Sequence, residues 1–154
     1  MRLAKKIGIV FLAVFIAIQF IQPARNKSGQ VLPTDISKTV AVTVPVDAIL
    51  KTACYDCHSN NTNYPWYASV QPFGWILNGH IRRGKAELNF SEFGSYSIRR
   101  QQSKLKSIVT QLNDNEMPLA SYIWMHKKAR LSIEEKTMVI EWARKAMEKI
   151  GDGK

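Results

Sequence analysis

Two cysteines and one histidine stand together in the pentapeptide Cys54-Tyr55-Asp56-Cys57-His58, and the 154-residue chain has no other cysteine. The spacing C-x-x-C-H is the attachment signature of a c-type haem. In such sites the two thiols add across the vinyl groups of the porphyrin, and the following histidine becomes the proximal ligand of the iron. Two intervening residues let one turn of chain present both sulfurs to one edge of the ring. The motif therefore predicts one covalent haem c.

Three other interpretations of the same residues remain open. A redox dithiol of the thioredoxin type occurs in a βαβ context, and the sequence around the motif shows no pattern of alternating strands and helices. A structural zinc site needs four ligands, which His80 and His126 would complete at spacings unlike those of zinc fingers. A plain disulfide would not require His58.

The other side of a haem iron needs its own ligand or an open position. Met117 is the best candidate, because it precedes Pro118 in a polar loop from which its sulfur can approach the face opposite His58. His80 or His126 would instead give bis-histidine ligation and a lower potential. Met125 is a weaker methionine candidate, and a five-coordinate iron is the remaining possibility.

Aromatic residues are frequent on both sides of these ligands. Flat side chains can cover an apolar haem face, while Tyr O–H and Trp N–H groups can bind propionates. Tyr64, Trp66 and Trp75 are the residues that we expect to pack against the haem. In a small domain such residues are also ordinary core, and here the haem would be the centre of that core.

Apolar residues at helical spacing predict a mainly α domain with four helices, over 45–56, 72–83, 98–112 and 133–150. The first would deliver the haem motif at its C-terminal end. Gly84 is expected to stop the second, and Ser132 with Glu135 forms a capping box for the last. Residues 84–97 are too polar and irregular to assign.

A basic start followed by the apolar run 7–21 predicts an export segment. The residues after the run make a poor cleavage site, so residues 1–24 are interpreted as an uncleaved membrane anchor. Basic residues ahead of the run would keep Met1 in the cytoplasm. This predicts a single-pass protein of the bacterial inner membrane, held by lipid contact, with its domain on the periplasmic side. Residues 25–43 are expected to form a linker and 44–150 the haem domain.

The chain carries 22 Lys and Arg against 12 Asp and Glu, a formal charge of +10. Nucleic acid is discounted as a partner, because part of this charge flanks the apolar run. A basic stretch in and near the second and third predicted helices admits propionate neutralisation, docking of an acidic redox partner, or a solvated face. It consists of Arg82, Arg83, Lys85, Arg99, Arg100, Lys104 and Lys106.

Together these residues resemble c-type cytochromes and, more closely, the small haem-binding domain family of exported bacterial proteins. The resemblance covers roughly 44–146 and is carried by Cys54-Tyr-Asp-Cys-His-Ser-Asn60, Tyr64-Pro-Trp-Tyr67, Trp75, His80, Leu88-Asn-Phe-Ser91, Met117-Pro118, Tyr122, His126, Ala129-Arg-Leu-Ser132 and Trp142. It implies covalent haem c at Cys54, Cys57 and His58. It does not supply a partner or a reaction.

The sequence thus predicts a compact cytochrome c-like helical domain around one haem, preceded by a transmembrane helix, with electron transfer as its function. Two axial protein ligands would leave no site for a substrate, which argues against an enzyme. A haem-based sensor or gas-binding protein with an open or displaceable distal site is the first alternative. A peroxidase-like enzyme is less favoured, because no distal acid–base pair is visible.

Overall fold

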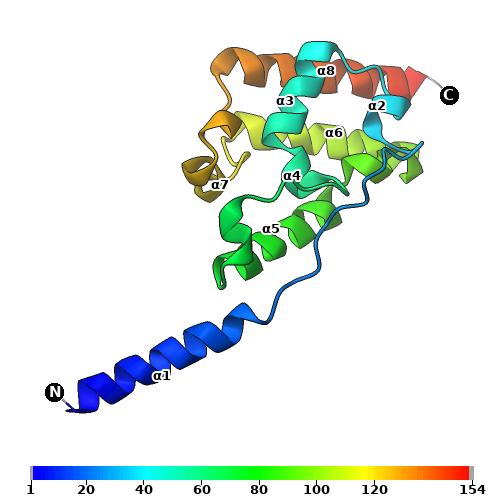
Figure 1. Ribbon diagram of the computed structural model, residues 1–154. Coiled ribbons are helices and arrows are strands. Elements are labelled where there is room, and N and C mark those ends of the chain that lie inside the picture. The colour runs from blue at the N-terminus through cyan, green and yellow to red at the C-terminus, as the bar shows by residue number, and fades with distance from the viewer. Residues whose placement is uncertain (1, 153–154) are drawn as a thin grey trace.

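The computed structural model describes residues 2–152, and this part of the chain is built from helices joined by loops, with a long extended connection between the first two helices (Figure 1). The elements in order are α1 (Arg2–Gln19), α2 (Ile36–Thr39), α3 (Val44–Ala53), α4 (Tyr55–His58), η1 (Trp66–Ser69), α5 (Phe73–Glu87), η2 (Phe90–Ser95), α6 (Ile98–Asn113), α7 (Ala120–Met125), η3 (Lys127–Ala129) and α8 (Ile133–Asp152). Within residues 2–152 the one β-type pairing is an isolated bridge between Lys27 and Asn61. The mainly α prediction is confirmed.

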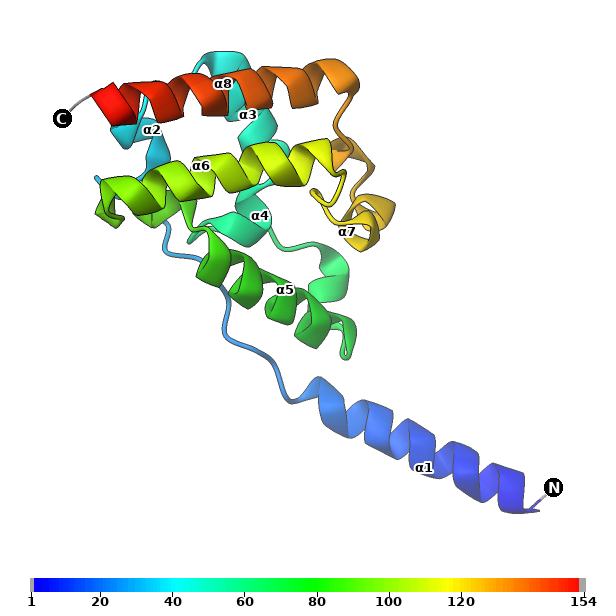
Figure 2. The same cartoon turned by 180° about the vertical axis from the view of Figure 1, so that it is seen from behind.

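The two longest helices of the domain, α6 and α8, lie side by side, and α3 packs against α8 (Figures 1 and 2). Leu105 on α6 and Val139 on α8 are both buried in the core that these helices share. Phe90 and Phe93 of η2 are buried in the same core. This larger core contains thirteen buried residues, so it is the main source of hydrophobic stabilisation in the described chain.

The capping box predicted for the last helix is present. The Ser132 hydroxyl accepts a hydrogen bond from the Glu135 amide at 3.1 Å, and the Glu135 carboxylate accepts one from the Ser132 amide at 2.8 Å. Two amides that have no partner inside the helix are satisfied in this way. The third predicted helix is also confirmed, as α6.

Two predicted helix boundaries were wrong. The helix expected over 45–56 ends at Ala53, and a separate turn, α4, carries the haem motif. The helix expected to stop at Gly84 continues to Glu87. The reason is packing: a Cβ at Gly84 would lie 2.6 Å from the Cys57 carbonyl oxygen, so glycine there permits α4 to touch α5 and does not end the helix.

The segment expected to be a linker contains a short helix that packs on the domain. Ile36 of α2 is fully buried in the larger core, and Asp35 caps α2 by accepting a hydrogen bond from the Ser37 amide. At least part of residues 25–43 is therefore fixed by burial of an apolar side chain. The domain boundaries themselves remain a prediction.

The N-terminal helix α1 projects away from the other helices in both views (Figures 1 and 2). It has 18 residues, and Arg2, Lys5 and Lys6 occupy its first turns. Crossing the hydrocarbon core takes about 20 predominantly apolar residues, so the charged start leaves the apolar run too short. Among residues 2–152, no helix combines the length and apolar character that crossing a bilayer requires. The predicted transmembrane helix and single-pass inner-membrane location were therefore wrong. The expected placement of the domain on the periplasmic side depended on that helix and no longer follows from it.

Candidate haem site

The haem motif forms one tight turn between α3 and α5. The amides of Cys57 and His58 both donate to the Cys54 carbonyl, at 3.2 and 3.0 Å. Both thiols are free and half-buried. Burial, with a smaller contribution from Cys57, raises the pKa of Cys54 to about 12, and burial followed by the charge of Asp56 raises that of Cys57 to about 11. Both are therefore neutral thiols near pH 7.

The imidazole of His58 has a fixed orientation. Its Nδ1 lies 3.0 Å from the Leu88 carbonyl oxygen, and since a carbonyl can only accept, Nδ1 carries the proton and Nε2 the free lone pair. Phe90 packs edge-on against the ring, with the centroids 6.2 Å apart. Burial lowers the pKa of His58, which favours the neutral form. A backbone carbonyl that holds one ring nitrogen is the usual support of a metal-binding histidine.

Three neighbouring cavities surround the motif. The His58 cavity, of about 300 Å³, lies between the motif and α6. The thiol cavity, of about 360 Å³, is lined by both cysteines. The aromatic cavity, of about 450 Å³, is lined by Cys57 and not by Cys54. The cavities are neighbours that share lining residues: Cys54 and His58 line the first two, and Cys57 and Tyr122 the last two. We refer to the three together as the hollow.

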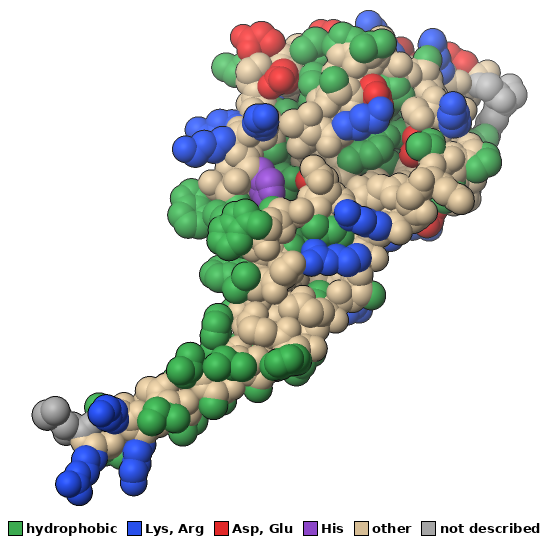
Figure 3. Space-filling model, in the orientation of Figure 1, with side chains coloured by type: hydrophobic (Ala, Val, Ile, Leu, Met, Phe, Trp, Pro, Cys, Tyr) green, Lys and Arg blue, Asp and Glu red, His purple; other side chains and the backbone are tan. Residues whose placement is uncertain are grey.

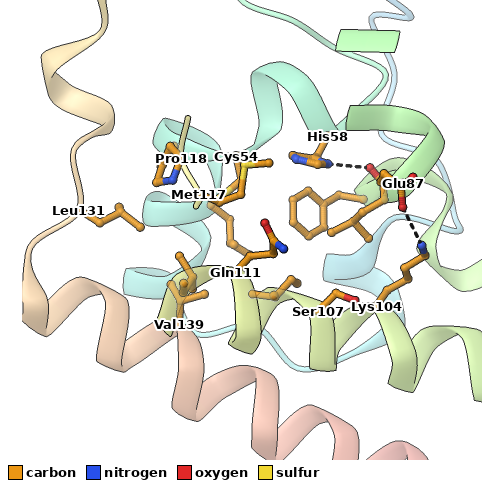
Figure 4. A pocket seen from close by; sticks show the side chains of 16 residues that line it. Cys54, His58, Glu87, Lys104, Ser107, Gln111, Met117, Pro118, Leu131 and Val139 are labelled. Carbon is orange, nitrogen blue, oxygen red and sulfur yellow. Dashed lines mark hydrogen bonds and ion pairs between the residues drawn. The ribbon is translucent and has the colours of Figure 1, made fainter. Parts of the chain in front are cut away.

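Met117 reaches this hollow from a segment distant in sequence from the haem motif. It lies in the loop between α6 and α7, where the amides of Glu116 and Met117 both contact the Gln111 carbonyl, at 3.0 and 3.4 Å. Its side chain is half-buried and lines both the His58 cavity and the thiol cavity. Figure 4 shows Met117, Gln111, Cys54 and His58 around the same space. The structure thus brings the predicted proximal and distal candidates to one cavity.

The two histidine alternatives occupy different places. His80 on α5 is half-buried and lines the thiol and aromatic cavities. His126 stacks on Tyr122 with the ring centroids 4.1 Å apart and packs edge-on against Tyr67. It is absent from the lining of all three cavities among the described residues. His80 is therefore the better placed alternative to Met117.

The three aromatic residues expected around the haem are not equivalent. Trp66 lines the aromatic cavity and is largely exposed. The Tyr64 hydroxyl instead accepts a hydrogen bond from the Asn26 amide, and the Trp75 indole donates to the Ile21 carbonyl. Tyr64 and Trp75 thus have other partners, and neither lines the three cavities described here.

One connection across the site was not predicted from the sequence. The Tyr122 hydroxyl of α7 donates to the Asp56 carboxylate at 2.6 Å, and the other carboxylate oxygen accepts from the Asn63 amide at 2.8 Å. Burial and then the Asp56 contact raise the pKa of Tyr122, which keeps the hydroxyl a donor. An acidic residue between the two cysteines was the signal in the sequence. The link joins the haem motif to the helix that follows Met117.

A zinc site finds no support in this arrangement. Within residues 2–152, no group of three or more His, Cys, Asp or Glu side chains is gathered closely enough to hold a metal ion. Among these described residues, the two thiols and His58 therefore lack the fourth protein ligand that a structural zinc site requires.

The comparison with known families decides the class of ligand. A family model described as "Haem-binding domain" matches residues 13–145. The chain belongs to this haem-binding domain family. It is a haem-binding protein, so haem is the ligand that the residues around the cavities must fit. No curated protein and no solved structure matches the chain.

The residues around the hollow fit a haem. His58 offers an unprotonated Nε2 toward a largely apolar space, and two neutral thiols lie on the same turn. The exposed guanidinium of Arg83 stands at the thiol cavity, where it would meet a carboxylate such as a propionate. Cys54, Cys57 and His58 are the residues that would hold the group.

Proposed function

We propose that this chain is a monohaem c-type protein that transfers electrons, with thioether bonds from Cys54 and Cys57 and with His58 as the proximal ligand. The orientation of His58 is the observation that carries the proposal, because Leu88 holds Nδ1 and leaves Nε2 for iron. Bound haem would supply a one-electron couple between ferric and ferrous iron. The motif turn keeps both thiols beside the imidazole that must face the iron.

Met117 is proposed as the distal ligand. It lines the same cavity as His58 but comes from the loop after α6, so its thioether approaches from a separate segment. Pro118 is buried directly behind it, which fixes the chain next to the sulfur. A thioether is a weak acceptor without a proton to lose, and His/Met ligation raises the haem potential relative to bis-histidine ligation.

An electron carrier is favoured over a catalyst by the same residues. If His58 and Met117 both held the iron, no ligand position would remain for a substrate. Leu50, Leu112 and Val139 form apolar walls of the His58 cavity. Such walls exclude water and keep the surroundings of the redox group constant between its two states.

The test is the absorption spectrum of the full chain, oxidised and reduced, produced in cells that attach c-type haem. We expect low-spin bands with a weak far-red sulfur-to-iron band that is lost in Met117→Ala. His80→Ala is the matched control, because His80 lines the same thiol cavity, and it should retain the band. Loss of the low-spin spectrum in His80→Ala would contradict Met117 ligation. Absence of covalent haem in the wild type would contradict the whole proposal.

A haem-based gas sensor is the second candidate, and Gln111 is the observation that favours it. Its amide side chain lines the otherwise mostly apolar His58 cavity beside Met117 (Figure 4). An amide N–H there could donate to a diatomic ligand that displaces the thioether. Rapid CO binding by the ferrous wild-type protein, with a C–O stretching frequency altered in Gln111→Leu, would favour the sensor over the carrier.

A further inference from the structure

Large apolar side chains are exposed around the mouth of the aromatic cavity. Trp66 is 80% exposed, Trp124 78% and Phe73 57%, and Ile76 and Met125 are also exposed. All five line this one cavity, and we refer to them as the aromatic patch. Soluble domains rarely expose such large apolar groups together unless the surface binds something.

The aromatic patch covers the approach to one haem attachment point. The cavity behind it is also lined by Cys57 and His80, and both residues line the thiol cavity as well. The patch therefore lies between solvent and the Cys57 side of the site. A molecule that docked there would be close to the edge of a haem attached at Cys57.

The surroundings of the patch are basic. Exposed Lys127 and Lys128 begin η3, which one residue separates from the end of α7. Exposed Arg83 lies three residues after His80 on the same face of α5. None of the ion pairs found within residues 2–152 involves these three side chains. The segments η1, α7 and η3 contain no acidic residue. Figure 3 shows hydrophobic side chains with Lys and Arg groups beside them on the side where α7 lies.

We propose that the aromatic patch, with Lys127, Lys128 and Arg83 around it, is the docking surface for an acidic one-electron redox protein. This inference rests on the proposed electron-transfer function and names the partner class and the surface. Basic side chains would steer an acidic partner, and the apolar side chains would fix its position beside Cys57. One electron leaves the reduced partner and reduces ferric iron to ferrous, and no bond forms or breaks.

The experiment uses the full haem-loaded chain and a reduced acidic [2Fe–2S] ferredoxin as the probe. The patch variant is Trp124→Ser with Lys127→Glu and Lys128→Glu. The matched control is Ile133→Ser with Lys145→Glu and Lys149→Glu on α8, which removes an equally exposed apolar side chain and the same charge. Stopped-flow reduction gives the rate constant, and calorimetry with both proteins oxidised gives the dissociation constant.

At low ionic strength the patch variant should lower the bimolecular rate constant and weaken binding by about 10-fold relative to the control, and the difference should shrink with added salt. Equal losses in both variants would overturn the proposal, because overall charge would then explain the steering. If sedimentation showed that the wild type is a dimer and the patch variant a monomer, the proposal would also be overturned, and the patch would be assigned to contact with a second copy. A wild-type spectrum without low-spin covalent haem would contradict the proposed function but not the docking surface. Calorimetry of the oxidised proteins tests docking independently of which residues bind the iron.

Discussion

At the scale of single residues, Gly84 decides how closely the haem motif can approach α5. A Cβ there would lie 2.6 Å from the Cys57 carbonyl oxygen and 3.2 Å from its carbonyl carbon. We therefore expect Gly84→Ala to force α4 away from α5 and to lower the free energy of unfolding by about 1–3 kcal/mol. Urea unfolding followed by circular dichroism measures the change, and the yield of attached haem should fall with it.

Gly79 provides the control for this prediction, since it lies on the same helix with no atom nearer than 3.9 Å to an added Cβ. Gly79→Ala should leave stability unchanged or raise it by up to about 1 kcal/mol, because alanine has the higher helix propensity. Similar losses in the two variants would mean that the contact with Cys57 is not what requires glycine.

At this scale the sequence predicted which candidate residues lie near one another, and the features that it missed have physical reasons. Spacing alone assigned Cys54, Cys57 and His58 to one turn, and Met117 was selected by its loop. The partner of His58 is the Leu88 carbonyl, and a backbone atom has no signature in a sequence. Gly84 was misinterpreted because a glycine that permits close packing and a glycine that ends a helix look alike without the tertiary contact.

At the scale of elements, the hydrogen bond between Tyr122 and Asp56 joins α7 to the haem motif. Removing the hydroxyl in Tyr122→Phe should lower the free energy of unfolding by about 1–2 kcal/mol, because a bond to a charged acceptor is lost. If Met117 is the distal ligand, the sulfur-to-iron band should also weaken, since the loop carrying Met117 leads directly into α7. Absorption spectra and urea unfolding of the haem-loaded variant give both quantities.

Tyr67→Phe is the matched control for that link. Tyr67 lines the same aromatic cavity as Tyr122, and none of the hydrogen bonds found in the described chain involves its hydroxyl. Its removal should change neither the band nor the unfolding free energy appreciably. Equal effects of the two substitutions would show that the hydrogen bond to Asp56 does not position the distal loop.

The start of α8 depends on the capping box. In Ser132→Ala the Glu135 amide loses its acceptor, and the expected cost is about 1 kcal/mol. Ser132→Thr keeps the hydroxyl and should cost much less. Thermal unfolding of both variants measures this, and a melting temperature of Ser132→Ala equal to the wild type would contradict the assigned role.

Elements with a local signal were predicted well, and elements fixed by tertiary contacts were not. The capping box and the apolar spacing of α6 and α8 are encoded within a few turns. The break after Ala53, the continuation of α5 past Gly84 and the burial of Ile36 depend on segments that are distant in sequence. The membrane anchor was predicted from the apolar run, whereas the basic residues at the start of α1 leave too few apolar residues to span a bilayer.

At the scale of the whole molecule, the three cavities border two unequal cores. The His58 cavity borders the larger core, the aromatic cavity borders the smaller one, and the thiol cavity lies beside the cysteines that contact both. The larger core joins α2, α3, η2, α6 and α8. The smaller contains three buried residues, Ala68, Leu77 and Ile81, against which Cys57, Tyr64 and Tyr67 pack. Cys54 contacts the larger core and Cys57 the smaller one. A haem bound to both cysteines would therefore connect the two cores.

Hydrogen exchange of the haem-free and haem-loaded chains tests this arrangement. Without haem, three buried residues supply little hydrophobic stabilisation to the η1–α5 unit, so its amides should exchange at least about 10-fold faster than those of α6 and α8. Haem attachment should slow exchange mainly in η1 and α5, because the ligand fills the cavities on which these elements border. The matched control is a Cys54→Ala/Cys57→Ala chain passed through the same haem-attaching cells, which should exchange like the haem-free protein. Uniform protection of α5, α6 and α8 in the haem-free chain would contradict this, because the two cores would then unfold as one unit and need no ligand to couple them.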